Sequence, residues 1–162
     1  MKKLITIIAI ALSFVATAQK VGHVNIQKIM VALPEYKASS DELNRFAENK
    51  QKELEMYIKL YREEEAKFAE EAQMLTEEIK QQRYEELMIS QQKIQAMQAE
   101  MEQQLIEKEQ MLLKPIDEKV RGAIATVAKA NGYKYVLEES MLMYFDDADS
   151  IDALVKKELG IE

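Results

Sequence analysis

The fold is decided by residues 35–113, which read EYKASSDELNRFAENKQKELEMYIKLYREEEAKFAEEAQMLTEEIKQQRYEELMISQQKIQAMQAEMEQQLIEKEQMLL. This stretch of 79 residues contains neither glycine nor proline. It is rich in Glu, Gln, Lys, Leu, Met and Ala, which all favour the α-helix. Pro34 stands directly before it, where proline is compatible with the first turn of a helix. The stretch therefore predicts an almost uninterrupted helical block.

Apolar side chains recur every seven residues in this block. The two series are Leu54, Tyr61, Phe68 and Leu75, then Leu87, Ile94 and Met101, which Leu105 and Leu112 continue after a four-residue step. Such a repeat forms one stripe that packs against a partner helix. The intervening positions hold Glu65, Gln91 and Gln98, where a strong coiled coil has aliphatic residues. We therefore expect a loose, bendable seam.

The length of the block favours two helices over one. An unbroken helix would measure about 120 Å, whereas a fold-back gives two helices of about 55–60 Å that cover each other's stripe. Thr76, followed by Glu77 and Glu78, resembles a helix N-cap with acids in the first turn. We predict an antiparallel hairpin with its turn at residues 72–76. One unbroken rod in a parallel coiled coil is the alternative.

The segments on either side of the block have a different character. Strands are predicted at Val21–Ile26, Tyr133–Leu137 and Leu142–Phe145, and helices at Ile116–Ala130, ended by Asn131-Gly132, and Ile151–Leu159, capped by Asp149 or Ser150 and ended by Gly160. The predicted fold class is α+β and mainly α. A long helical hairpin arm, residues 35–113, projects from a small β-containing body formed by residues 19–34 and 114–162.

The N-terminus has the layout of a secretory signal peptide. Lys2 and Lys3 precede an apolar run over residues 4–16, and small residues follow at 16–18. The run is too short to cross a bilayer, which needs about 20 apolar residues. We predict cleavage near Ala18 and an exported, soluble protein. Cleavage changes the net charge from −7 to −9, and a chain this acidic is a poor binder of nucleic acid.

Residues that carry catalysis are scarce. The chain has one histidine, no cysteine and no tryptophan, and its glycines do not form a phosphate-binding loop. We therefore expect no enzyme activity, no cofactor and no nucleotide. His23 has no partner at a catalytic or metal-binding spacing, so we expect it at the surface or at an interface.

One acidic cluster suggests calcium at first sight: Asp146, Asp147, Asp149 and Asp152. Read as an EF-hand from Asp147, it has Ile151 at the fifth position and Asp152 at the sixth, where glycine belongs. We expect a polar turn and a helix cap, and no metal.

The block carries two features that point to binding. Residues 41–113 contain 18 Asp or Glu and 10 Lys or Arg, so most of the negative charge lies there. The block also contains Met56, Met74, Met88, Met97, Met101 and Met111. Methionine is flexible and polarisable, and surfaces that bind varied partners are rich in it. Of these residues Met101 lies on the seven-residue stripe, whereas Met88 and Met97 lie off it.

The order of the segments resembles the Skp/OmpH family of periplasmic chaperones. The resemblance rests on Val-Gly-His-Val-Asn-Ile, residues 21–26, running into Gln-Lys-Ile, on Gly-Tyr-Lys-Tyr-Val-Leu, residues 132–137, and on the closing segment from Met-Tyr-Phe, residues 143–145, to Leu159. It extends over essentially the whole chain after the signal peptide.

The resemblance implies a periplasmic homotrimer whose bodies form a small barrel-like core and whose arms enclose a cavity. Family members hold unfolded outer-membrane proteins there without ATP. On this hypothesis Val24, Ile26, Val136 and Leu137 build the trimer core, and Tyr57, Met88, Met97 and Met101 contact clients.

Two considerations set limits on this hypothesis. Family arms are basic, whereas this arm is acidic, so binding to membrane surfaces is not carried over. The rival interpretation is an exported coiled-coil scaffold or spacer that docks one folded envelope partner.

Overall fold

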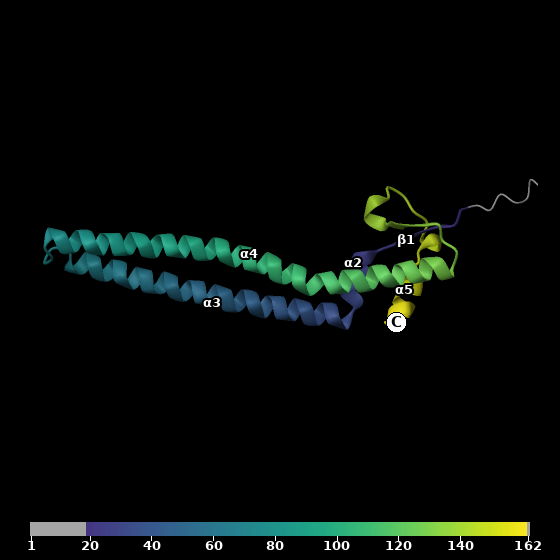
Figure 1. The fold of residues 1–162 in the computed structure, drawn as a ribbon, viewed down its shortest axis with the longest axis horizontal. Coiled ribbons are helices and arrows are strands. Elements are labelled where there is room, and N and C mark those ends of the chain that lie inside the picture. Colours follow the sequence, from purple (N-terminus) through teal and green to yellow (C-terminus); the bar gives the residue numbers. More distant parts are fainter. Residues whose placement is uncertain (1–18, 162) are drawn as a thin grey trace, which may run out of the picture. The chain divides into compact units, whose positions relative to one another are not determined.

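The computed structural model describes residues 19–161 (Figure 1). The predicted signal peptide, residues 1–18, lies outside the described residues. The elements are β1 (Val21–Val24), α2 (Ile26–Ala32), α3 (Pro34–Glu71), α4 (Glu77–Ala130), β2 (Tyr135–Glu138), the short 3-10 helices η2 (Glu139–Met141) and η3 (Asp147–Asp149), and α5 (Asp152–Leu159). This mainly helical architecture with a small sheet confirms the predicted fold class. Residues 33–117 form one compact unit, and the segments before and after them form a second.

The unit of residues 33–117 is an antiparallel helical hairpin, in which α3 and the first part of α4 lie side by side (Figure 1). Pro34 is the first residue of α3, as predicted. The chain turns over residues 72–76, where the Met74 amide donates to the Glu71 carbonyl at 2.8 Å. Thr76 caps α4, because its hydroxyl accepts from the Ile79 amide at 3.4 Å. The hairpin and its turn are therefore confirmed.

The seam between the two helices follows the predicted stripe. Leu54 is buried, and Tyr61, Phe68, Leu75, Leu87, Ile94 and Met101 are partly buried. The prediction for the intervening positions is wrong, because Glu65, Gln91 and Gln98 are all exposed. Ser90 and Met97 take the places of Gln91 and Gln98 and are partly buried. On α4 the second row of seam residues therefore lies three residues after the stripe residues Leu87 and Ile94, whereas the sequence predicted a spacing of four. Met97 is thus a seam residue.

Helix α4 does not end at the proline. A separate helix was predicted from Ile116, yet α4 continues through Pro115 to Ala130. Proline removes the amide that would bond the carbonyl of Met111, but its fixed φ suits a helix. Burial of Ile116, Val120 and Val127 on one face stabilises the helix beyond this point. Gly132 then ends it in the left-handed conformation, with φ of 71°, as predicted.

The second unit is organised around a parallel pair of strands. β1 and β2 pair from Val21 with Tyr135 to Val24 with Glu138. On the other edge of β1, the Ile151 amide donates to the His23 carbonyl at 2.9 Å. Among the described residues no strand pairs with the outer edge of β2.

The predicted strand at Leu142–Phe145 is absent. This segment is irregular and lies between η2 and η3. Met143 and Tyr144 are 106% and 85% exposed, so within one chain these side chains have no core to pack against. A strand requires a hydrogen-bonded neighbour, and none pairs with this segment in the described residues.

The expectation for His23 is also wrong. Its side chain is buried, with Nδ1 at 3.1 Å from Glu139 Oε1 and Nε2 at 2.9 Å from the Asp146 carbonyl oxygen. The Phe145 ring lies against it, with 4.5 Å between ring centroids. His23 therefore joins β1 to the segment after β2. These partners lie more than 110 residues away along the chain, so local sequence spacing could not reveal them.

The aspartates of the C-terminal segment have structural roles. The Asp146 carboxylate accepts from the Ala148 amide at 2.9 Å and caps η3. Asp152 begins α5 and accepts from the Asn25 amide at 2.9 Å. Lys28 Nζ lies 3.5 Å from its second carboxylate oxygen. Among residues 19–161 no group of three or more acidic or histidine side chains is arranged to hold a metal ion.

Two glycines give a matched test of this packing. A Cβ on Gly22 would lie 2.8 Å from Tyr133 Cε1 and 3.0 Å from Ile151 Cγ2, whereas a Cβ on Gly122 would meet nothing within 4 Å. We expect Gly22→Ala to lower the free energy of unfolding by about 1–3 kcal/mol through overpacking. Gly122→Ala should raise it by about 0.5–1 kcal/mol, because alanine favours the helix interior. Urea denaturation measures both, and a stabilised Gly22→Ala protein would contradict the packing described.

Candidate functional site

An apolar groove lies in the unit that contains the sheet. Its volume is about 450 Å³, and its lining residues are Val24, Ile26, Arg121, Ile124, Ala125, Ala128, Val136, Glu138 and Met141. They come from the two strands, the start of α2, the last turns of α4 and the end of η2. Most of them are apolar, so the groove offers an unfilled apolar surface beside the sheet.

Three of the four predicted trimer-core residues meet in this groove. Val24 is 2% exposed, and Ile26 and Val136 are partly buried. Leu137 pairs with His23 in the parallel register, so its side chain lies on the opposite face of the sheet from Val136. It is 40% exposed. The trimer-core role of these four residues stays a prediction.

The groove contains residues that sequence reasoning missed. Ile124, Ala125 and Ala128 come from α4, and Met141 from η2. The sequence could have indicated Ile124 and Ala128, because they are spaced four residues apart on a helix and follow Ala123 and Val127, which are buried. Glu138, also in the lining, has both carboxylate oxygens 3.3 Å from the Ile26 amide. It satisfies an amide at the N-terminus of α2 that has no helical partner.

Exposed apolar side chains follow the last groove residue along the chain. Met141 is 80% exposed, and Met143 and Tyr144 follow it in the irregular segment. The outer edge of β2 carries unpaired backbone groups, and such an edge is a template for pairing with another chain. Apolar surface next to an open edge is typical of an interface.

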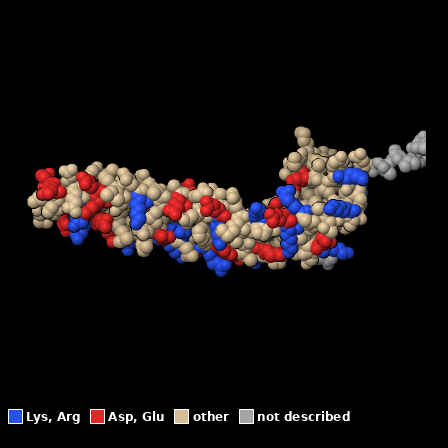
Figure 2. Space-filling view, viewed as in Figure 1, with Lys and Arg blue, Asp and Glu red and all other residues tan. Residues whose placement is uncertain are grey.

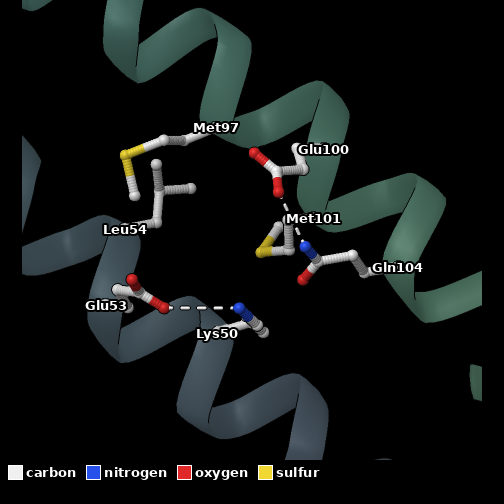
Figure 3. A pocket seen from close by; sticks show the side chains of 7 residues that line it. All are labelled: Lys50, Glu53, Leu54, Met97, Glu100, Met101 and Gln104. Carbon is white, nitrogen blue, oxygen red and sulfur yellow. Dashed lines mark hydrogen bonds and ion pairs between the residues drawn. The ribbon is translucent and has the colours of Figure 1, made fainter.

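The hairpin contains a much smaller hollow of about 80 Å³ (Figure 3). Met97 and Met101 extend from α4 toward Leu54 on α3 (Figure 3). The other lining residues are polar and bond within their own helices: Lys50 lies 3.5 Å from Glu53, and Gln104 donates to Glu100 at 2.8 Å. Met97 and Met101 therefore help to fill the seam around Leu54.

The other two predicted client contacts lie nearer the hairpin surface. Lys93 Nζ stands 4.6 Å above the Tyr57 ring centroid, and Met88 is 39% exposed. Met56, Met74 and Met111, which the sequence analysis noted as methionines of the block, are also exposed. So are several apolar residues that it did not note, namely Leu60, Ile79, Tyr84, Ile89 and Ile106. In the sequence, these residues could be recognised only as apolar residues outside the seven-residue stripe. Client contact for all of these residues stays a prediction.

Ion pairs between the two helices are few. Lys108 on α4 pairs with Glu42 on α3 at 2.5 Å, and this hydrogen bond and charge lower the pKa of the Glu42 carboxyl. Lys59–Glu63, Lys80–Glu77 and Arg83–Glu86 are pairs within one helix. Such exposed pairs contribute little to stability. Apolar packing therefore holds the seam together.

A family model described as "Outer membrane protein (OmpH-like)" matches residues 20–159, almost the whole described chain. This chain belongs to the OmpH-like family. A comparison with curated proteins gives no match. Among solved structures, the OmpH-like chain is similar to a protein of Caulobacter crescentus CB15 that is described as an OmpH-like outer membrane chaperone. The TM-score is 0.75 with 16% sequence identity, over 88% of this chain and 85% of that chain.

The structural likeness shows that the two proteins share a fold. None of the helices described over residues 19–161 is long and apolar enough to cross a membrane.

Because few side chains of the seam are buried, we expect the stability of the hairpin to depend strongly on Leu54. It is the only buried residue of α3, at 5% exposed, and it contacts the Met97 and Met101 hollow. We expect Leu54→Ala to destabilise the hairpin by about 2–3 kcal/mol, the lower part of the usual range for a buried leucine. Hydrogen exchange of the amides around residues 50–60 and 94–104 measures the loss. The control Met56→Ala, at a side chain that is 54% exposed, should change exchange by less than about 0.5 kcal/mol. Equal effects would contradict the seam assignment.

Proposed function

We propose that this protein is an ATP-independent periplasmic holdase. It binds unfolded outer-membrane proteins in a cavity formed by the arms of a homotrimer. The family match over residues 20–159 carries the proposal. The description of the Caulobacter crescentus protein as an outer membrane chaperone supports it. Export follows from the predicted signal peptide, and no catalytic role is part of the proposal.

The sheet unit supports self-assembly. A two-stranded sheet is marginally stable by itself. The open edge of β2, the apolar groove and the exposed Met143 and Tyr144 side chains are the surfaces that a second and third copy would cover. Pairing between copies would also give the 142–145 segment the neighbouring strand that it lacks.

The hairpin supports the holding of non-native chains. Its seam leaves apolar side chains such as Leu60, Tyr84 and Ile89 between 49% and 65% exposed. Each contact to an unfolded client would be weak, but several arms acting together raise the effective affinity. A strut that sets a fixed distance would need a more fully packed seam than one with a single buried residue in α3. This contrast favours the holdase over the spacer.

The holdase activity has a direct test. Purified protein without residues 1–18 should suppress light scattering when an outer-membrane β-barrel protein is diluted from urea, with no ATP present. Suppression should saturate near one trimer per client, because one cavity holds one chain. A folded, soluble protein serves as the control and should not bind. Failure to suppress aggregation at large molar excess would contradict the proposal.

The spacer interpretation predicts the opposite pattern. A scaffold would bind one folded envelope protein tightly and saturably, and it would be indifferent to unfolded clients. Binding assays against both kinds of partner separate the two functions.

Assembly through the groove predicts that a charge at Val136 separates the copies. Val136→Asp would bury an unpaired carboxylate against apolar side chains, which is costly. We expect the molecular mass from light scattering to fall about threefold, from trimer to monomer, as the interface core is lost. The matched control is Val31→Asp, which places the same charge on a side chain that is 55% exposed outside the groove. Circular dichroism checks that both variants keep their helices. A trimeric Val136→Asp protein would place the interface elsewhere.

A further inference from the structure

Two hollows near the turn of the hairpin share three lining residues. The first, of about 250 Å³, is lined by Glu64, Phe68, Arg83, Glu86, Leu87 and Ser90. The second, of about 190 Å³, is lined by Glu64, Lys67, Phe68, Glu71, Leu75 and Arg83. Because Glu64, Phe68 and Arg83 line both, we treat them as a single surface and name it the outer groove.

The floor of the outer groove is apolar. Phe68, Leu75 and Leu87 lie on the seven-residue stripe and are partly buried. Beside them the lining carries Glu64 and Ser90, one charged and one small, so the helices do not fill the space over the floor. The outer groove thus has an apolar floor flanked by polar and charged side chains.

The rim of the outer groove has a small net negative charge and lies in a strongly acidic part of the hairpin. It carries three glutamates, Glu64, Glu71 and Glu86, and two basic residues, Lys67 and Arg83, of which Arg83 Nη1 lies 3.4 Å from Glu86 Oε2. Residues 62–86 contain nine glutamates and four Lys or Arg, a net charge of −5 within the −8 of residues 41–113. Figure 2 shows acidic side chains gathered over this end of the hairpin. Outside the lining, burial and then the charge of Glu65 raise the pKa of Tyr61.

We propose that the outer groove binds segments of non-native polypeptide in which apolar and basic side chains are interspersed. Apolar side chains of such a segment would cover the Phe68 floor, and Lys or Arg would reach the glutamate rim along their long apolar stems. Acidic segments and anionic lipid surfaces are repelled by the same rim. This inference rests on the proposed holdase function and names its preferred client segments as cationic.

Three synthetic peptides test the preference. They share one pattern of apolar residues and differ only in carrying Lys, Gln or Glu at the remaining positions. At low salt, fluorescence anisotropy with the protein lacking residues 1–18 should show the Lys peptide binding at least about tenfold more tightly than the Glu peptide. The ratio should shrink in about 0.5 M salt, where charges are screened. Equal affinities for the Lys and Glu peptides would overturn the inference.

Paired variants locate the effect. Glu64→Gln, Glu71→Gln and Glu86→Gln together should reduce the Lys-to-Glu ratio to about threefold or less and leave the Gln peptide unchanged. The matched control is Glu48→Gln, Glu102→Gln and Glu109→Gln, which removes the same charge from exposed positions outside the outer groove. It should retain most of the preference. Equal losses in both variants would assign the preference to the general field of the hairpin and overturn the outer groove as the site.

The floor has a separate test. Phe68→Ala should weaken all three peptides by a similar factor, because it removes apolar contact and no charge. Hydrogen exchange with the Lys peptide bound should show protection at residues 64–71 and 83–90, and protection confined to other residues would overturn the site. Suppression of aggregation without any charge preference would overturn this inference and leave the holdase proposal standing. A charge-selective peptide footprint without suppression would overturn the holdase proposal alone.

Discussion

The parallel pairing of β1 with β2 is the constraint on which the rest of the fold depends. Parallel strands cannot be joined by a tight turn and require a crossover connection. Here the connection runs over residues 25–134, and the helical hairpin makes up most of it. An antiparallel hairpin returns the chain near its starting point, so its length adds little to the entropy of closing the loop. His23 and Asp152 then join the chain after β2 to β1 and to the start of α2.

The hairpin itself follows from how little two helices can bury. Each helix covers one stripe of the other helix, and the face on the far side of each helix is exposed to solvent whatever its sequence. The result is a seam of partly buried side chains around Leu54, with methionines adapting to the gaps. Beside the exposed Glu64 and the small Ser90, a hollow is left over Phe68 and Leu87. Exposed apolar surface on the hairpin thus arises from incomplete packing of the seam.

Local chemistry made the hairpin predictable. The absence of glycine and proline, the Thr76 cap and the Gly132 and Gly160 stops each act within a few residues, and the structure agrees with all of them. The predictions that were wrong concern features that depend on contacts between residues far apart in the sequence. Pro115 was read as a boundary, but burial of the side chains beyond it carries α4 onward. His23 and the groove depend on contacts across more than 100 residues, which one sequence does not reveal.

The seven-residue seam also bears on how such proteins can change over evolution. Because side chains meet with the same spacing along the hairpin, a paired insertion or deletion of seven residues in α3 and α4 preserves which positions face each other. The turn at residues 72–76 and the sheet need not alter. The length of the hairpin can therefore change by whole seven-residue repeats. Lineages could tune it in steps of about 10 Å, the rise of two helical turns, while keeping the rest of the chain unchanged.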